Sequence, residues 1–203
     1  CISDDEVVRE ASRQEVVRRY YNALCSARQG MGGKDEIYRL ELIMSKLGIT
    51  PEIRTCAIEA KKKAEETSAP AVAIELPDGT IVTGKTSSLL GSSAAALLNA
   101  LKKLAGIDDD ILLISPAVIE PIQKLKTEHM GNSNPRLHMD EVLIALSICA
   151  VTAPIAAKAL DQLEKLRRTE AHSTVILSRV DENVFKKLGV NVTCEPQYQT
   201  KKL

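Results

Sequence analysis

The chain has 203 residues, with 27 basic and 27 acidic side chains and a formal net charge of zero at neutral pH. Because no net charge draws it toward polyanions, we expect neither a nucleic-acid-binding nor a membrane-surface protein. Four Tyr, one Phe and no Trp also leave few side chains on which bases could stack. The length fits one domain, or one domain with a helical addition.

The five cysteines are odd in number, widely spaced and never arranged as Cys-x-x-Cys. This distribution is typical of a reducing compartment and argues against a disulfide framework or a zinc knuckle. The longest apolar run, residues 142–157, is too short to span a bilayer and contains Pro154. We therefore predict a cytoplasmic protein with no membrane partner, no metal site and no cofactor. The first residue is Cys rather than Met, which indicates a fragment of a longer protein.

Residues 1–68 are predicted to form a helical segment. Ser3 and Glu6 are spaced as a capping box, Gly48 is a typical helix stop, and Thr50-Pro51 is a typical helix start. These signals predict helices at residues 3–29, 35–47 and 50–67. The buried stripe of the first helix is expected at Val17, Tyr20, Tyr21 and Leu24, and Arg9, Arg13, Arg18 and Arg19 are expected on its solvated face. Nothing in this segment indicates a catalytic or binding site.

Residues 69–203 are predicted to form an α/β domain. Alternating β-branched residues on both sides of Asp78-Gly79 predict a hairpin of residues 71–76 and 80–83. Further helices are predicted at residues 87–104, 116–128, 142–151, 154–168 and 181–188, and further strands at residues 111–115, 173–177 and 190–194. This alternation predicts a three-layer α/β/α sandwich whose mixed sheet is largely parallel beyond the hairpin.

The predicted element order resembles that of the cytidine-deaminase-like fold. Zinc deaminases of that fold carry His or Cys followed by Glu where the post-hairpin helix begins, and Pro-Cys-x-x-Cys further on. Residues 87–96 and 115–119 contain neither pattern. The resemblance therefore extends to architecture and not to deaminase chemistry.

Residues 79–86, Gly-Thr-Ile-Val-Thr-Gly-Lys-Thr, match the phosphate-loop pattern G-x-x-x-x-G-K-[ST]. The match would place Ile81 and Val82 inside a loop, whereas Asp78-Gly79 is typical of a hairpin turn with positive φ at the glycine. We therefore expect a strand here rather than a nucleotide-binding loop. Two interpretations of the next helix start stay open. Gly84, Lys85, Thr86 and Ser87 could hold an anion there, or a serine could simply cap the helix.

Polar side chains concentrate in residues 129–141. Candidate ligand-binding residues in this stretch are His129, Asn132, Asn134, Arg136, His138 and Asp140. Arg136 could hold a phosphate or a carboxylate through paired hydrogen bonds, and the imidazoles titrate near neutral pH. His172, beside a predicted strand, could face the same cleft. The alternative is a long connection held by Asn and Asp turns, with Asp140 capping the next helix and His172 bonded to a backbone carbonyl.

Five runs of the chain resemble the bacterial domain-of-unknown-function family eighteen forty-six: DDEVVREASRQEVVRRYYNAL, PAVAIELPDGTIVTGKTSSLLG, EPIQKLKTEHMGNSNPRLHMDEVLIALSICA, EAHSTVILSRVDENVFKKLGV and NVTCEPQYQTKKL. The resemblance covers essentially the whole chain. It implies the C-terminal part of a cytoplasmic protein whose N-terminal part is Rossmann-like and carries a Gly-rich, Lys-containing loop. No activity and no catalytic residue come with the family.

Together these features predict an uncharacterised module that lines a cleft for a nucleotide or another phosphorylated small molecule. Residues 84–88 and 129–141 and His172 are expected to meet there, where helices begin after strands. Expected partners are the N-terminal Rossmann-like part and, as an oligomer, a second copy of the chain. Two alternatives stay open: a structural or oligomerisation module without a site, and a hydrolase that uses either Cys194, which would need His172 beside it, or the histidine-containing stretch 129–141.

Overall fold

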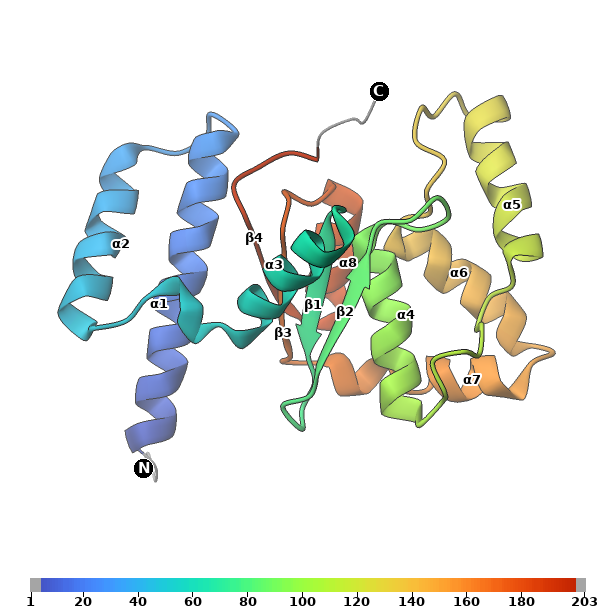
Figure 1. Cartoon of the computed structure of the whole chain (residues 1–203), viewed down its shortest axis with the longest axis horizontal. Helices are drawn as coiled ribbons and strands as arrows, with labels where there is room; N and C mark the ends of the chain where they lie inside the picture. The colour runs from blue at the N-terminus through green and yellow to red at the C-terminus, as the bar shows by residue number, and fades with distance from the viewer. Residues whose placement is uncertain (1–4, 200–203) are drawn as a thin grey trace.

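The computed structural model describes residues 5–199, so the cap predicted at Ser3 lies outside the described residues. Helix α1 (Asp5–Arg28) and helix α2 (Lys34–Leu47) form a pair beside the sheet (Figure 1). Val17, Tyr21, Met44 and Ile49 are the buried centre of this pair. Gly48 ends α2 at φ 62°, as predicted. A short 3₁₀ turn, Pro51–Ile53, leads into helix α3 (Thr55–Thr67).

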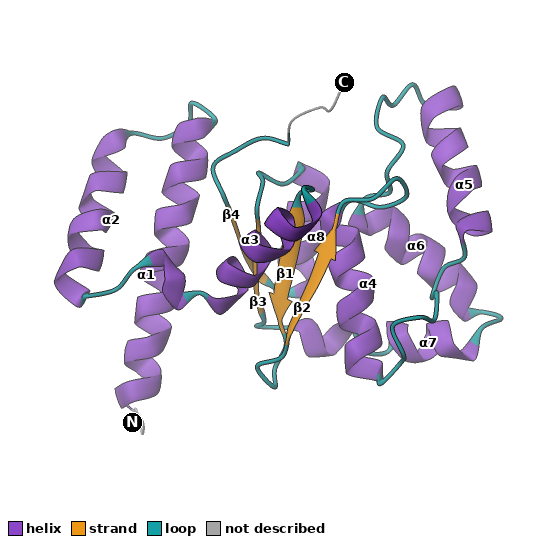
Figure 2. Ribbon diagram, in the orientation of Figure 1, coloured by secondary structure: helices purple, strands orange, loops and turns teal. Residues whose placement is uncertain are grey.

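One four-stranded mixed sheet forms the centre of the molecule (Figure 2). Its strands are β1 (Ala71–Glu75), β2 (Ile81–Lys85), β3 (Glu170–Ser173) and β4 (Asn191–Cys194), in the order β2-β1-β3-β4. β1 runs antiparallel to both β2 and β3, and β3 and β4 are parallel. The predicted mixed sheet and its hairpin are confirmed, but the parallel part is limited to one pair of strands.

Helices pack on both faces of this sheet. Because side chains alternate along a strand, Val72 and Ile74 join the main core with α4 (Ser92–Ala105), whereas Ala73 contacts Cys56 and Ala60 of α3. The remaining helices lie on the α4 side: α5 (Pro116–Lys124), α6 (Met139–Ala150), α7 (Pro154–Leu160) and α8 (Arg179–Leu188). A π-helical turn, Leu125–His129, follows α5, and a 3₁₀ turn, Leu163–Leu166, follows α7.

The strand predicted at residues 111–115 is wrong, because these residues form no strand. Leu113 and Ile114 are buried in the main core, which explains the strand-like apolar pattern. The carbonyl oxygens of Asp109 and Ile111 accept hydrogen bonds from Nζ of Lys102, at the end of α4, instead of from a neighbouring strand. The cytidine-deaminase-like element order is therefore not met at this point.

Other predicted boundaries shift for local reasons. The helix predicted from residue 87 begins at Ser92, because the Ser87 hydroxyl accepts from the N–H groups of Leu89 and Leu90 in a turn. The strand predicted at residues 173–177 lies at Glu170–Ser173. Ile176, from the β-branched run, instead donates its N–H to the carbonyl of Gln197 in the C-terminal tail. Within residues 5–199, no helix combines the length and apolar character that a membrane crossing requires.

Candidate functional site

A cleft of about 390 Å³ lies at the carboxyl edge of the sheet. β2, β3 and β4 all end at this edge, because β2 and β3 are both antiparallel to β1 and β4 is parallel to β3. It is the upper edge in Figure 1. Helices α4, α6 and α8 all begin beside it. The lining residues are Gln29, Gly91, Ser92, Ser93, Asn134, Arg136, Leu137, His138, Val175, Ile176, Leu177, Ser178, Asp181, Tyr198 and Gln199.

The N-terminus of α4 meets the cleft without a side-chain cap. Its N-cap residue is Gly91, which has no side chain to accept the free N–H groups of the first turn. Ser92 and Ser93 follow, and only 6% and 2% of their surfaces are exposed. Neither hydroxyl has a hydrogen-bond partner among residues 5–199. This helix start therefore offers backbone and hydroxyl donors to the cleft.

Side chains, by contrast, cap the N-termini of both α6 and α8: Ser178 caps α8, and Asp181 caps α6. Oδ1 of Asp181 accepts a 2.9 Å hydrogen bond from the N–H of Met139, the first residue of α6. Its own N–H donates to Oγ of Ser178, the N-cap residue of α8, at 3.1 Å. Asp181 is only 7% exposed. Of the three helix starts at the cleft, the one at α4 is therefore left to bind a ligand.

His138 lies at the cleft with one ring nitrogen already engaged. Nδ1 of His138 is 3.0 Å from Oδ2 of Asp181, and Oγ of Ser178 donates to the same carboxylate oxygen at 2.9 Å. The hydrogen bond with Asp181 raises the pKa of His138, although burial opposes the shift. Burial alone would raise the pKa of Asp181, but hydrogen bonds from His138, Met139 and Ser178 lower it overall. The pair thus favours an ionised Asp181.

The polar stretch 129–141 is held against the start of α4. Buried Lys126 donates to the carbonyl of Arg136 and to Oε2 of Glu141, both at 2.7 Å. Nε of Arg136 donates to the carbonyl of Ser87 at 2.7 Å, and the N–H of Gly91 donates to the carbonyl of Leu137 at 3.1 Å. The structure thereby brings together two of the three segments that the sequence analysis placed at one site.

The phosphate-loop match belongs to the hairpin, as expected. Gly84 and Lys85 lie in β2 and pair with Val72 and Ala71, so their backbone belongs to the sheet rather than to a phosphate-wrapping loop. A Cβ atom at Gly84 would lie 2.1 Å from the backbone nitrogen of Ala96, so this glycine permits close packing of α4 on β2. Lys85 is exposed.

The predicted site residues therefore separate into groups. Asn134, Arg136 and His138 line the cleft. Ser87 does not line it, but its carbonyl accepts a hydrogen bond from Nε of Arg136. Gly84, Lys85, Thr86, His129, Asn132 and Asp140 are not among its lining residues in the described chain. Ser92, Ser93, Ser178 and Asp181 were missed. The small-residue run Gly91-Ser92-Ser93 after a strand was the available signal for the first two.

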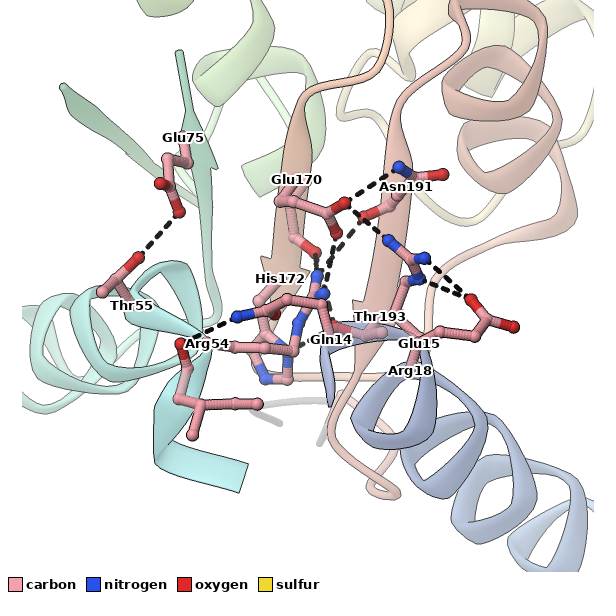
Figure 3. A network of polar contacts seen from close by, with 12 residues as sticks. Gln14, Glu15, Arg18, Arg54, Thr55, Glu75, Glu170, His172, Asn191 and Thr193 are labelled. Carbon is pink, nitrogen blue, oxygen red and sulfur yellow. Dashed lines mark hydrogen bonds and ion pairs between the residues drawn. The ribbon is translucent and has the colours of Figure 1, made fainter. Parts of the chain in front are cut away.

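His172 lies away from the cleft, in a buried polar cluster against α1. Its Nδ1 is 2.8 Å from Oγ1 of Thr193, and its Nε2 is 3.3 Å from Oε1 of Glu195 (Figure 3 shows the contact with Thr193). Tyr21 packs edge-on against the ring, with centroids 4.8 Å apart. Burial lowers the pKa of His172 more strongly than Glu195 raises it. His172 is therefore a neutral, enclosed side chain.

Glu195 completes this cluster and was also missed. Lys61 of α3 pairs with its Oε1 at 2.8 Å. Burial opposes ionisation of Glu195, but His172 and Lys61 lower its pKa to about 2. A second hollow of about 270 Å³ lies beside Tyr21 and Lys61. Its lining carries two lysines and two glutamates, so it offers an anion no excess of positive charge.

Arg54 forms a second buried network at the opposite edge of the sheet, where β3 begins. Its guanidinium donates to Oε2 of Glu170 at 2.7 Å and to the carbonyl of Ala171 at 2.9 Å (Figure 3). Arg18 of α1 donates to Oε1 of Glu170 at 2.6 Å. Arg18 was predicted on a solvated face, and that prediction is wrong because Glu170 draws it against the sheet. One sign in the sequence indicated burial of Arg54, namely its position between the apolar residues Ile53 and Cys56.

Cys194 does not form a nucleophilic pair with His172. The parallel register places Thr193 opposite His172 and Cys194 opposite Ser173, so the thiol and the imidazole point to opposite faces of the sheet. Burial raises the pKa of Cys194 to about 12, which keeps the thiol protonated. The hydrolase alternative based on this thiol therefore has no geometric support.

Two family models match the chain. The first, "Domain of unknown function DUF1846, C-terminal", matches residues 52–203. The second, "Domain of unknown function DUF1846, N-terminal", matches residues 1–48. The chain belongs to the DUF1846 family. The two models meet between α2 and α3, which agrees with the packing of α3 on the sheet and of α1 with α2.

Three curated relatives of this DUF1846 chain are named UPF0371 proteins. The UPF0371 protein CE2832 of Corynebacterium efficiens is 58% identical over all 203 residues. UPF0371 proteins of Streptococcus pneumoniae serotype 19F and of Streptococcus thermophilus are each 52% identical over the same length. The chain spans 41% of the length of each of these relatives.

Proposed function

We propose that this DUF1846 chain binds the phosphate group of a nucleotide or another small phosphorylated molecule in the cleft at the start of α4. The carrying observation is the uncapped helix start at Gly91, flanked by the unpartnered hydroxyls of Ser92 and Ser93. Helix N-termini favour anions because their N–H groups point outward and the helix dipole is positive there.

Cationic side chains complete the proposed phosphate site. Of the three guanidinium nitrogens of Arg136, only Nε has a partner among the described residues, so the two terminal nitrogens are left for paired hydrogen bonds to a phosphate. His138 contributes positive charge when protonated, and its raised pKa extends the pH range in which it does so. The remaining lining, including Val175, Ile176 and Tyr198, offers apolar surface to the rest of a ligand.

Calorimetric titration of the purified protein with inorganic phosphate, pyrophosphate, nucleotides and sugar phosphates tests this function. We expect saturable binding that Arg136→Ala weakens by roughly tenfold or more, as for a lost charge-assisted hydrogen bond. Ser93→Ala should weaken it less. Lys85→Ala is the matched control, because Lys85 is exposed and outside the cleft lining. No binding by any of these ligands would contradict the proposal, and loss of binding in Lys85→Ala would move the site to residues 84–86.

The whole protein provides the context for this proposal. The relatives are more than twice as long as the chain, and residues 1–48 match the model of an N-terminal domain. We infer that the chain works as the C-terminal region of a cytoplasmic protein whose preceding Rossmann-like part is its partner. Ligand affinity of the full-length protein should then exceed that of the 203-residue chain. Equal affinities would indicate that the cleft acts alone.

A structural role is the second candidate, and one feature of α6 supports it. Ile144, Ile148 and Val151 lie three to four residues apart and are 62%, 64% and 83% exposed. An exposed apolar stripe of this kind is typical of a surface that associates with another chain. If the stripe joins two copies, Ile148→Glu should convert a dimer to a monomer in light scattering. A wild-type monomer at all concentrations would remove this candidate.

A further inference from the structure

Asp181 fixes the orientation of the His138 ring at the cleft. Its buried carboxylate accepts hydrogen bonds from the N–H of Met139 at 2.9 Å and from Oγ of Ser178 at 2.9 Å, and it lies 3.0 Å from Nδ1 of His138. An ionised carboxylate only accepts hydrogen bonds, so the hydrogen bond assigns the ring proton to Nδ1. In the neutral ring, Nε2 then carries a free lone pair, and it has no hydrogen-bond partner among residues 5–199.

The ring is attached to the segment that borders the anion-binding end of α4. The carbonyl of Leu137, the residue before His138, accepts from the N–H of Gly91 at 3.1 Å. Ser93, whose hydroxyl is unpartnered and whose surface is 98% buried, lines the same cleft. Arg136 lies two residues before His138. Ser93, Arg136 and His138 all line this cleft, so a phosphate bound by the first two would share the cleft with the His138 ring.

We propose that the cleft is a phosphoryl-transfer site in which Nε2 of His138 attacks the phosphorus of the bound phosphorylated molecule. This inference rests on the proposed function, because it needs a phosphate in the cleft. A P–N bond forms as the P–O bond to the remainder of the ligand breaks. The electron pair leaves with that oxygen, which takes a proton from water. Nε2 loses no proton, since the proton of the ring stays on Nδ1.

The second half of the reaction restores His138. A water oxygen forms a new bond to phosphorus, the P–N electron pair returns to Nε2, and both protons of the water leave with inorganic phosphate or pass to solvent. Arg136 and the free N–H groups of α4 hold the phosphoryl oxygens in both steps, and positively polarised donors stabilise the charge that develops on them. The net reaction is hydrolysis of a phosphate ester or an acyl phosphate.

Asp181 acts as a positioning residue in this scheme. It keeps the ring in the Nδ1–H form and stabilises the positive charge that the ring gains on attack. Binding and transfer then respond to pH in opposite ways. Protonated His138 attracts the phosphate, but only neutral His138 can attack it. Phosphate affinity should therefore fall, and the transfer rate should rise, as pH increases through the pKa of His138.

Incubation of the purified protein with acetyl phosphate tests the proposal. We expect a stoichiometric, acid-labile and alkali-stable phosphoryl group, which peptide mapping by mass spectrometry locates on His138. His138→Asn should abolish this labelling, and His129→Asn, the matched variant at an exposed histidine outside the cleft lining, should retain it. In Asp181→Asn, the midpoint of the rate–pH profile should move to lower pH, which a merely structural role of Asp181 would not produce.

Parallel titration with inorganic phosphate separates the hypothesis of phosphate binding from the hypothesis of phosphoryl transfer to His138. Phosphate binding with neither labelling of wild-type protein nor release of inorganic phosphate from acetyl phosphate at any pH would overturn phosphoryl transfer and leave the binding function intact. Absence of both would overturn both. Labelling at His129 or at another residue would also overturn the assignment to His138. Peptide mapping of the wild-type protein gives this answer even if the His138 variant fails to fold.

Discussion

Nη1 of Arg54 lies 2.7 Å from Oε2 of Glu170, and this ion pair joins the start of α3 to the start of β3. The Arg54 side chain is fully buried, and Glu170 is also held by Arg18 of α1. Glu170 therefore links α1 and α3 to the sheet that positions the cleft.

Replacing Arg54 should destabilise the protein strongly. Arg54→Ala leaves the Glu170 carboxylate with one fewer partner and opens a cavity in place of a large side chain. We expect the free energy of unfolding to fall by about 3–5 kcal/mol, measured by urea denaturation. Arg9→Ala is the control, because Arg9 is 69% exposed and should change stability by about 0.5 kcal/mol or less. Equal effects of the two variants would show that the Arg54 pair is not structurally important.

Replacing Gly84 should separate α4 from β2. An added Cβ atom would lie 2.1 Å from the nitrogen of Ala96 and 2.6 Å from the carbonyl carbon of Ala95, and both are backbone atoms. Gly84→Ala should cost at least about 1–3 kcal/mol of stability, as in other overpacked cores. Gly33→Ala is the comparison variant, since φ is −101° there and nothing lies within 4 Å of the new atom. A fully stable Gly84→Ala protein would contradict the close packing described for this strand.

The pKa of His138 should depend on Asp181. In Asp181→Asn, NMR titration of the imidazole should show a lower pKa than in the wild type, because the charged hydrogen-bond partner is lost. The raised pKa of His138 stabilises the fold below about 6.5, its ordinary value, and this contribution disappears as pH rises through the raised value. The lowered pKa of Asp181 stabilises the fold above about 3.8. The His138–Asp181 pair therefore adds most to the free energy of unfolding between pH 3.8 and 6.5. An unchanged pKa of His138 in Asp181→Asn would contradict this interaction.

The buried histidine His172 should make the protein sensitive to acid. Its pKa is lowered in the fold, so below about pH 6.5 the unfolded chain binds a proton that the folded chain excludes. Stability should therefore fall as pH decreases from 7 toward 5, opposite in sign to the contribution of His138. Urea denaturation across this range should show a shallower decrease in His172→Gln than in the wild type. An equally steep decrease in both proteins would assign the acid sensitivity to other groups.

Local sequence patterns were sufficient to predict much of the fold. The Gly48 stop, the Asp78-Gly79 hairpin turn and the final helix and strand all depend on interactions within a few residues, and all are found. The same local logic failed at residues 111–115. The apolar run there is partly buried, but it could form a strand only beside a neighbouring strand. Nζ of Lys102 donates hydrogen bonds to the carbonyl oxygens of Asp109 and Ile111 instead.

The residues of the candidate site were harder to predict than the fold, because they are brought together by contacts between residues that are distant in the sequence. Asn134, Arg136 and His138 were recognised as candidates because polar side chains gather in one loop, and they do line the cleft. Asp181 lies 43 positions after His138, and nothing in its own helix indicates that it would hold that ring. His172 was expected near the cleft, but strand alternation turns it toward Thr193 and α1.

The sequence by itself determined the local elements, the absence of net charge and the family, because propensity, turn chemistry and similarity are carried by neighbouring residues. Only the tertiary structure decided that α4 packs closely on the strand of the GKT match, that Arg54 and His172 are enclosed, and that α4 begins uncapped beside His138. These outcomes depend on which groups satisfy one another's hydrogen bonds across the fold, and a linear pattern does not encode that choice.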